Sequence, residues 1–343
     1  MAGRIAYLRA FGCYLPSRVV DNAELAPLVG VDPAWLLRAT GIEQRRYAAP
    51  EETVASLGAK AAADCLQFAG LNAREVGLLI AASGSGERRF PGPAAAIGFE
   101  LGIGGVPAVD LPMASAGSLF GMSLAARLSG DYGNVLVIGS EIMSRVVRCN
   151  PAGRDSAILF GDGAGACLVS ASFEGAQFQG AQFQGTQTGF PEIADSLLCS
   201  DGEFGEALRL DLDSPIHMEG RTIILQAARK IPRTIADLLA RNQLQPAHVD
   251  TFLMHQANGN LITRVAQALS VRESRFFRNV AHYGNTSSAS LLIAAAEWWR
   301  ARGGQIEGPV VFAAFGAGLH WGALLATPHS TAPLTLRDFA SEP

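Results

Sequence analysis

The chain has 343 residues, of which 49% are hydrophobic and 17% charged, a composition typical of a large, well-buried globular protein. Its length exceeds what one compact core normally holds, so two domains or two fused halves are expected. The net charge of −4 gives no indication of a basic surface that would bind nucleic acid or an anionic membrane.

Apolar runs such as VLVIGS are far shorter than the roughly 20 residues that cross a bilayer. The opening stretch, MAGRIAYLRAFG, lacks the pattern of a signal peptide, so we expect a cytoplasmic protein. The five cysteines show no CxxC or Cys/His spacing, which predicts reduced thiols rather than a zinc site or disulfides. The phosphate-binding loop GxxxxGK[ST] does not occur. GSGERR (84–89) contains glycines but lacks the dinucleotide-binding fingerprint and the acidic residue that should follow it. We therefore expect no metal and no resident cofactor.

Apolar, β-branched runs alternate with Ala/Leu-rich stretches along most of the chain, which predicts an α/β protein with helices packed on sheets. In the first half, segment 109–121 reads VDLPMASAGSLFG. A predicted strand ends at Asp110, and small residues then lead into an apolar helix. Ser115 lies at this junction, where a hydroxyl with few polar neighbours is a candidate nucleophile.

The middle of the chain has two unusual segments. GAQFQGAQFQG (175–185) is a tandem pentapeptide that predicts an edge strand or a connector. Segment 186–220 is acidic and rich in turn residues, and a long excursion of this kind often covers a site. The tail from Ser330 onward is expected to be peripheral.

Three polar motifs follow predicted strands in the second half. MHQANG (254–259) ends an apolar strand at His255, and HYGNTSSAS (282–290) places Asn285 in a loop before a helix. AAFGAGLHWG (313–322) adds a glycine-rich turn. The ends of strands are where α/β folds place their chemistry, so these motifs are candidates for one site with Ser115.

The two halves also echo each other in sequence. LNAREVGLLIAASGSG (71–86) is similar to LQPAHVDTFLMHQANG (244–259), and FGDGAGACLV is echoed by FGAGLHWGALL. Two motifs repeated in the same order predict an internal duplication. We place the N-terminal half, with the candidate nucleophile, at 1–174 and the C-terminal half, with His and Asn, at 175–343.

Nearly the whole chain resembles the thiolase superfamily, and within it the β-ketoacyl-ACP synthase III (initiating ketosynthase) branch. The segments that carry the resemblance are FGCYLPSRVVDNAEL, TGIEQRRYA, RDSAILFGDGAGA, HQAN, YGNTSSAS and FGAGLHWGA. The resemblance implies an αβαβα five-layer fold of two duplicated halves, a homodimer and a Cys-His-Asn triad. The family's His and Asn fall on His255 and Asn285, and its nucleophilic cysteine falls on Ser115. The oxyanion hole is implied at the backbone amides of Ser115 and Ala317.

Serine in place of cysteine changes the chemistry. A thiolate is populated near neutral pH and is favoured at a helix N-terminus, whereas an alcohol needs a base during attack. His255 is a candidate for that base. Two explanations stay open: a natural serine variant, such as an acyltransferase to oxygen, nitrogen or sulfur, or a ketosynthase whose cysteine was replaced by serine and which traps its substrate.

The resemblance also implies a coenzyme A site. Trp35 and Arg154 match the pair that stacks on the adenine of coenzyme A, and an aromatic face with a guanidinium suits a base. A further arginine of the family falls on Ala39, with Arg38 adjacent as a substitute.

Phe90 matches the residue that reaches across the dimer into the partner's acyl pocket, and Met113, beside the nucleophile, is expected to reshape that pocket. The family docks acyl carrier protein through basic residues, but Asn260 and Leu225 stand at two positions where lysine is expected. The basic residues that remain nearby are Arg221, Arg229, Lys230 and Arg264. Docking to a carrier protein is therefore an open expectation.

These observations predict an acyltransferase or ketosynthase of the synthase III type that takes an acyl group from acyl-CoA or acyl-ACP onto residue 115. The expected setting is the biosynthesis of secondary metabolites or fatty-acid-related compounds. The alternative from another class is a non-catalytic partner subunit of a heteromeric synthase.

Overall fold

The computed structural model describes residues 5–171, 189–211 and 214–329. The first half of the chain forms five strands in the order β5-β4-β6-β7-β1. Strand β4 pairs in parallel with both β5 and β6, whereas β7 is antiparallel to both β6 and β1. Their bounds are β1 Ala6–Tyr14, β4 Val76–Ala82, β5 Ala108–Leu111, β6 Asn134–Ile142 and β7 Asp162–Ala171.

In the second half, the order β11-β12-β13-β8 repeats the order β4-β6-β7-β1 of the first half. Outside β11, Phe276 forms a parallel bridge with Phe252, at the position that β5 holds in the first half. The bounds are β8 Glu192–Ser200, β11 Thr251–Met254, β12 Val310–Gly316 and β13 His320–Thr327. The two sheets join through one residue pair, Tyr7 with Glu192. The matching strand orders confirm the predicted duplication.

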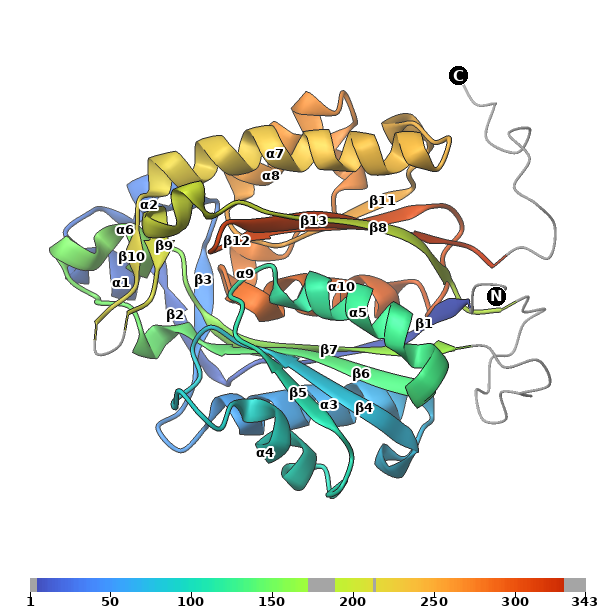
Figure 1. The fold of residues 1–343 in the computed structure, drawn as a ribbon. Helices are drawn as coiled ribbons and strands as arrows, with labels where there is room; N and C mark the ends of the chain where they lie inside the picture. The colour runs from blue at the N-terminus through green and yellow to red at the C-terminus, as the bar shows by residue number, and fades with distance from the viewer. Residues whose placement is uncertain (1–4, 172–188, 212–213, 330–343) are drawn as a thin grey trace.

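Helices divide the molecule into five layers (Figure 1). Helices α3 and α4 cover the outer face of one sheet, α7 and α8 cover the outer face of the other, and α5 and α10 lie between the sheets. Helix α10 buries nearly every residue, as a helix between two sheets must. The bounds are α3 Val54–Ala69, α4 Pro93–Glu100, α5 Gly117–Tyr132, α7 Gly220–Arg241, α8 Gly259–Ala268 and α10 Ser290–Ala301. The predicted five-layer α/β fold is confirmed.

The remaining short elements gather at one end of the layers, on the left in Figure 1. They are α1 Asn22–Leu28, α2 Pro33–Thr40, α6 Arg154–Ala157, α9 Val280–Tyr283, β2 Arg18–Asp21, β3 Gln44–Tyr47, β9 Leu208–Arg209 and β10 His217–Met218. Asp32 caps α2 by accepting from the Trp35 amide, and Gly41 ends the helix in the left-handed conformation that favours glycine. These interactions fix the short helix that carries Trp35.

Part of the sequence interpretation needs correction here. Residues 192–200, expected within a turn-rich excursion, form β8, a strand inside the sheet. Segment 175–185, the boundary at 174/175 and the tail from Ser330 lie outside the described residues. No helix in the described ranges is long and apolar enough to cross a membrane.

Candidate active site

Ser115 lies between the end of β5 and the start of α5, and it is buried. Its φ of 59° is in the left-handed region, which is uncommon for residues other than glycine and concentrates at functional sites. Gly316, at the end of β12, permits this turn, because a Cβ there would lie 2.9 Å from that of Ser115. No side chain caps α5, so the positive end of the helix faces the turn with Ser115.

His255 follows β11 directly, and its backbone amide donates to the carbonyl oxygen of Ala313 over 2.8 Å. Its ring Nδ1 lies 2.5 Å from the hydroxyl oxygen of Ser290, the first residue of α10. The same oxygen accepts from the backbone amide of Gln256 over 3.1 Å. Burial lowers the pKa of His255 from 6.5 to about 4, so the imidazole is neutral at physiological pH.

Asn285 lies in the loop that leads from α9 toward α10. Its backbone amide donates to the carbonyl oxygen of Leu159 over 2.8 Å. Its side-chain Oδ1 accepts from the backbone amide of Ser287 over 2.9 Å. The hydroxyl oxygen of Ser287 in turn accepts from the backbone amide of Ser115 over 3.0 Å. Ser287 therefore links the predicted nucleophile to the predicted asparagine.

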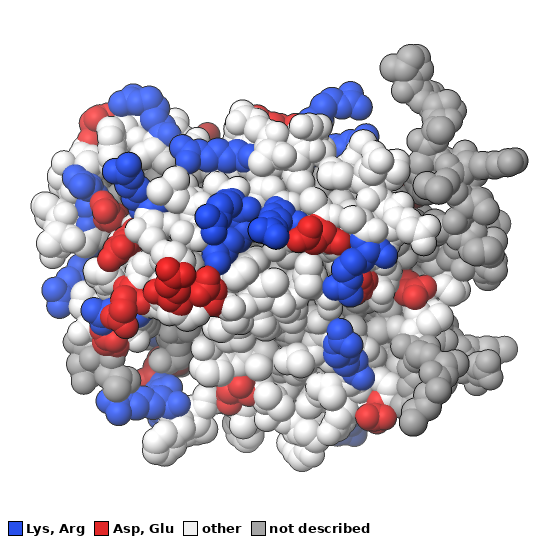
Figure 2. All heavy atoms as spheres, turned by 45° about the horizontal axis from the view of Figure 1, so that its top comes forward, with Lys and Arg blue, Asp and Glu red and all other residues white. Residues whose placement is uncertain are grey.

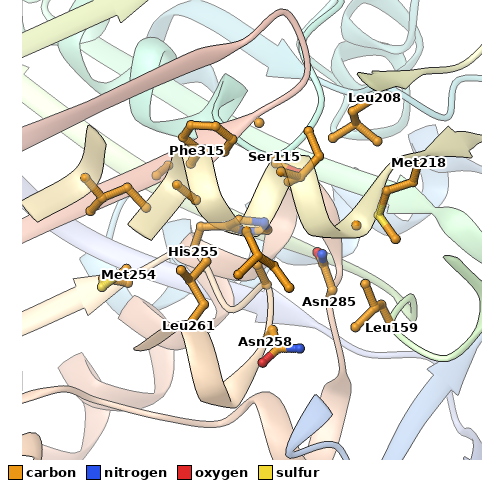
Figure 3. Close-up of a pocket in the computed structure, with 18 of the residues that line it drawn as sticks. Ser115, Leu159, Leu208, Met218, Met254, His255, Asn258, Leu261, Asn285 and Phe315 are labelled. Carbon is orange, nitrogen blue, oxygen red and sulfur yellow. The ribbon is translucent and has the colours of Figure 1, made fainter. Parts of the chain in front are cut away.

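Ser115, His255 and Asn285 line one cavity, so the structure brings the three predicted residues together (Figure 3). They come from three separate places in the chain: the β5–α5 junction, the end of β11 and the loop before α10. The rest of the wall is mostly apolar, and its members include Leu159, Met218, Ile224, Met254, Leu261 and Phe315. A mostly apolar cavity with a few polar groups is typical of a small-molecule site.

A second cavity meets Ser115 from another side. Ser115 shares its wall with Gly84, Met143, Leu208, Leu210, Ile216, Ser287 and Ala317. Leu208, Leu210 and Ile216 belong to segment 186–220, so part of this segment forms the wall of the cavity beside Ser115.

The two residues of the predicted oxyanion hole both line this second cavity. The backbone amide of Ser115, however, is already bonded to Ser287. An oxyanion at this position would therefore have to share or displace that bond.

The residues predicted to bind coenzyme A lie together. The guanidinium carbon of Arg154, on α6, lies 5.8 Å from the centroid of the Trp35 ring, on α2. The side chain of Asn258, which lines the first cavity, donates to the carbonyl oxygen of Ala39 at the end of α2. The Trp35 helix is thus joined directly to the cavity wall. The side chain of Arg38 is exposed on the same helix.

Phe90 and Met113, predicted at the acyl pocket, are not among the described residues that line either cavity. The Phe90 side chain is 84% exposed and contributes to neither of the two cavities at Ser115. A role across a dimer stays a prediction.

Two site residues were missed from the sequence, Ser287 and Ser290, although both lie in the NTSSAS stretch beside Asn285. The described residues include no group of three or more His, Cys, Asp or Glu that could hold a metal ion. The five cysteines are free, and none of them lines the two cavities at Ser115.

Known proteins share this architecture along nearly the whole chain. Residues 109–187 match the family 3-oxoacyl-[acyl-carrier-protein (ACP)] synthase III, and residues 239–327 match its C-terminal part. A relative from Vibrio vulnificus (strain YJ016), β-ketoacyl-[acyl-carrier-protein] synthase III 1, is 35% identical, over 92% of this chain and 96% of its own.

Solved structures agree with the sequence matches. The 3-oxoacyl-[acyl-carrier-protein] synthase III from Aquifex aeolicus VF5 has a TM-score of 0.85 at 31% identity, over 94% of this chain and 99% of its own. The priming β-ketosynthase from the R1128 polyketide biosynthetic pathway has a TM-score of 0.83 at 28% identity, over 95% and 97%. The fold is that of a thiolase-like acyltransferase. With its similarity to the Vibrio protein along nearly its full length, the chain belongs to the β-ketoacyl-ACP synthase III family.

Proposed function

We propose that the chain takes an acyl group from an acyl thioester, most simply acyl-CoA, onto residue 115 and passes it to an acceptor. The observation that carries this proposal is the meeting of Ser115, His255 and Asn285 at one mostly apolar cavity beside the N-terminus of α5. The names of the relatives, acyl-carrier-protein synthases and a polyketide priming ketosynthase, support a fatty-acid-related or polyketide pathway.

In the first half-reaction, the Ser115 oxygen attacks the carbonyl carbon of the thioester. The C–S bond breaks, the acyl group becomes an ester on Ser115, and the serine proton goes to the departing coenzyme A thiolate. The positive end of α5 stabilises negative charge on the attacking atom and on the tetrahedral intermediate. A serine needs help to lose its proton, and this step limits the rate unless a base assists.

His255 is poorly suited as that base, because burial lowers its pKa to about 4. We assign the Ser290 hydroxyl as the donor and Nδ1 of His255 as the acceptor of the hydrogen bond between them. The imidazole then carries its proton on Nε2 and acts as a donor. We propose that His255 and Asn285 together hydrogen-bond the carbonyl oxygen of an acceptor thioester.

That pair of donors suits a malonyl thioester as acceptor. Loss of CO2 leaves an enolate, whose oxygen would be stabilised by His255 and Asn285. The enolate carbon then attacks the ester carbonyl on residue 115 and a C–C bond forms. The bond to the Ser115 oxygen breaks, and the resulting alkoxide takes a proton from water. This chemistry favours carbon–carbon bond formation over transfer to a hydroxyl, amine or thiol.

The acyl-CoA would enter beside Trp35 and Arg154. Because the guanidinium already lies in cation–π contact with the ring, Arg154 would have to move outward for an adenine to stack between them. An acyl carrier protein would approach over α7 and α8, where Figure 2 shows basic side chains mixed with acidic ones. Lys230 is a weak candidate for docking, because it is paired with Asp201 and lies 4.1 Å over the Trp321 ring. Of the other basic residues named from the sequence, Arg221, Arg229 and Arg264 are exposed.

The test of the proposal is intact-protein mass spectrometry after incubation with a panel of acyl-CoAs. We expect an adduct of the acyl mass on the parent chain and none on Ser115→Ala. Ser115→Cys should acylate faster, by about tenfold or more, because a thiolate forms more readily beside the helix N-terminus. With malonyl-CoA added, the cysteine form should release a β-ketoacyl product.

Absence of an adduct on both the parent and the cysteine form would refute the proposal and favour a non-catalytic partner subunit. An amide or ester product from the parent with a simple amine or alcohol, and no condensation by the cysteine form, would instead identify heteroatom acyl transfer.

A further inference from the structure

Glu141 has no part in the steps above, yet it lies fully buried near the end of β6, with 0% of its surface exposed. A buried carboxylate is costly unless several donors satisfy its oxygens. Glu141 collects donors from two loops, one in each half of the chain, and both loops contact the turn that holds Ser115.

The first loop follows β4. Its donors to Glu141 are the Ser83 hydroxyl over 3.2 Å, the Gly84 amide over 3.0 Å, and both the amide and the hydroxyl of Ser85, over 2.9 and 2.5 Å. Gly84 packs tightly on Ala114, the residue before Ser115, because a Cβ at 84 would lie 2.7 Å from that of Ala114. Glu141 therefore fixes the surface against which the nucleophile turn rests.

The second loop precedes α10. The backbone amide of Ser288 donates to the other oxygen of Glu141 over 3.2 Å. Its neighbour Ser287, with a φ of 48°, accepts from the Ser115 amide and donates to Asn285. Ser115 and Ser287 thus both have left-handed backbones, and they are bonded to each other. Strained residues of this kind persist only where the surroundings hold them firmly.

We infer that Glu141 is a positioning residue: its carboxylate clamps the two loops so that residue 115 and Asn285 keep the geometry for acyl transfer. This inference rests on the proposed acylation of residue 115. The carboxylate suits the task because it only accepts hydrogen bonds, and every group that faces it is a donor. In Glu141→Gln, the new NH2 group would face N–H or O–H donors. Part of the hydrogen bonding that holds the two loops together would therefore be lost.

The chain offers a matched control in Asp162, a buried carboxylate at the start of the neighbouring strand β7. It accepts from the Ala48 amide over 2.7 Å and from the amide and hydroxyl of Ser144 over 2.8 and 2.6 Å. None of these donors bonds to Ser115, Ser287 or Asn285. Asp162→Asn should therefore lower the unfolding temperature as Glu141→Gln does, without disturbing the nucleophile turn.

The experiment measures the rate constant for acylation of residue 115, the KM for acyl-CoA and the unfolding temperature of the parent and both variants. We expect Glu141→Gln to lose at least about tenfold in the acylation rate constant, because small misplacements of reacting atoms are costly. Its KM should stay within about twofold, since Trp35 and Arg154 are untouched. Asp162→Asn should keep both quantities within about twofold of the parent.

Equal acylation by Glu141→Gln and the parent would overturn the inference, as would an equal loss in Asp162→Asn. If Glu141→Gln does not fold, Ser85→Ala carries the test, because it keeps the carboxylate and removes the hydroxyl that donates to it over 2.5 Å. An unchanged acylation rate in Ser85→Ala then counts against the clamp.

Hydrogen exchange separates this inference from the proposed function. The amides of residues 287 and 288 should exchange faster in Glu141→Gln than in Asp162→Asn, whether or not the parent acylates. Absence of an adduct on both the parent and Ser115→Cys refutes the proposed function and leaves the clamp untouched, whereas unchanged exchange in Glu141→Gln refutes the clamp.

Discussion

At the scale of single residues, the protonation state of His255 follows from its burial and gives a pH prediction. The pKa is 6.5 in an ordinary setting and about 4 in the folded chain. Between these values the unfolded chain binds a proton that the folded chain excludes. Stability therefore falls as the pH drops from 6.5 toward 4, and this one group accounts for up to about 3 kcal/mol of the loss.

Denaturant unfolding at pH 7 and pH 4.5 measures that loss. Glutamine at position 255 cannot titrate. The free energy of unfolding of His255→Gln should therefore fall by about 2 kcal/mol less than that of the parent between pH 7 and pH 4.5. Groups that titrate elsewhere, such as His320, are present in both chains and cancel in the comparison. Equal losses in the two chains would show that His255 is not held neutral by burial.

Residue-scale features also show where sequence interpretation stops. Ser115, His255 and Asn285 could be found because each follows a predicted strand inside a recognisable motif. Glu141 could not be connected to them, although a lone acid in the apolar run VLVIGSEI is a signal of a buried charge. Its donors lie 56 to 58 residues before it and 147 residues after it, and only the folded sheets bring them together.

At the scale of elements, helix α2 links the molecular surface to the first cavity. Its Trp35 ring lies beside Arg154, and its C-terminal end accepts from Asn258 in the cavity wall. We expect Trp35→Ala or Arg154→Ala to raise the KM for acyl-CoA about tenfold, because each variant loses a stacking or cation–π contact with the adenine.

The same variants should change the KM for an acyl-pantetheine thioester by less than about twofold, because that substrate lacks the adenine. Steady-state kinetics with both substrates makes the comparison. An equal rise in KM for the two thioesters would show that Trp35 and Arg154 support the structure of α2 and α6 rather than bind the adenine.

Strand β8 shows why elements are harder to predict than motifs. Its sequence, EIADSLLCS, mixes polar and apolar residues, and it follows a segment rich in turns. It nevertheless pairs with β13 along its length, and its Asp195 is bonded to Arg241 and Asn242 of the α7 end. Partners distant in sequence satisfy the polar side chains, so local pattern alone could not identify the strand.

At the scale of the whole molecule, the free edge of the first sheet predicts how two copies assemble. Strand β5 is the last strand of its sheet, and Val109 on it is 45% exposed. An edge strand with unpaired backbone groups is a template for pairing, and the apolar Phe90 and Phe99 are also exposed in this half. We propose that two chains form a homodimer through their β5 edges.

Light scattering after size exclusion tests this assembly with two matched substitutions. Val109→Glu would place two like charges near the symmetry axis of the paired edges, so we expect a monomer at concentrations where the parent is a dimer. Leu225→Glu also replaces an exposed apolar side chain with glutamate, at a 56% exposed residue of α7 on the outer helical layer, and should leave the dimer intact. A dimeric Val109→Glu chain would move the interface away from β5. In that case, the prediction that Phe90 enters a partner's acyl pocket would no longer be supported.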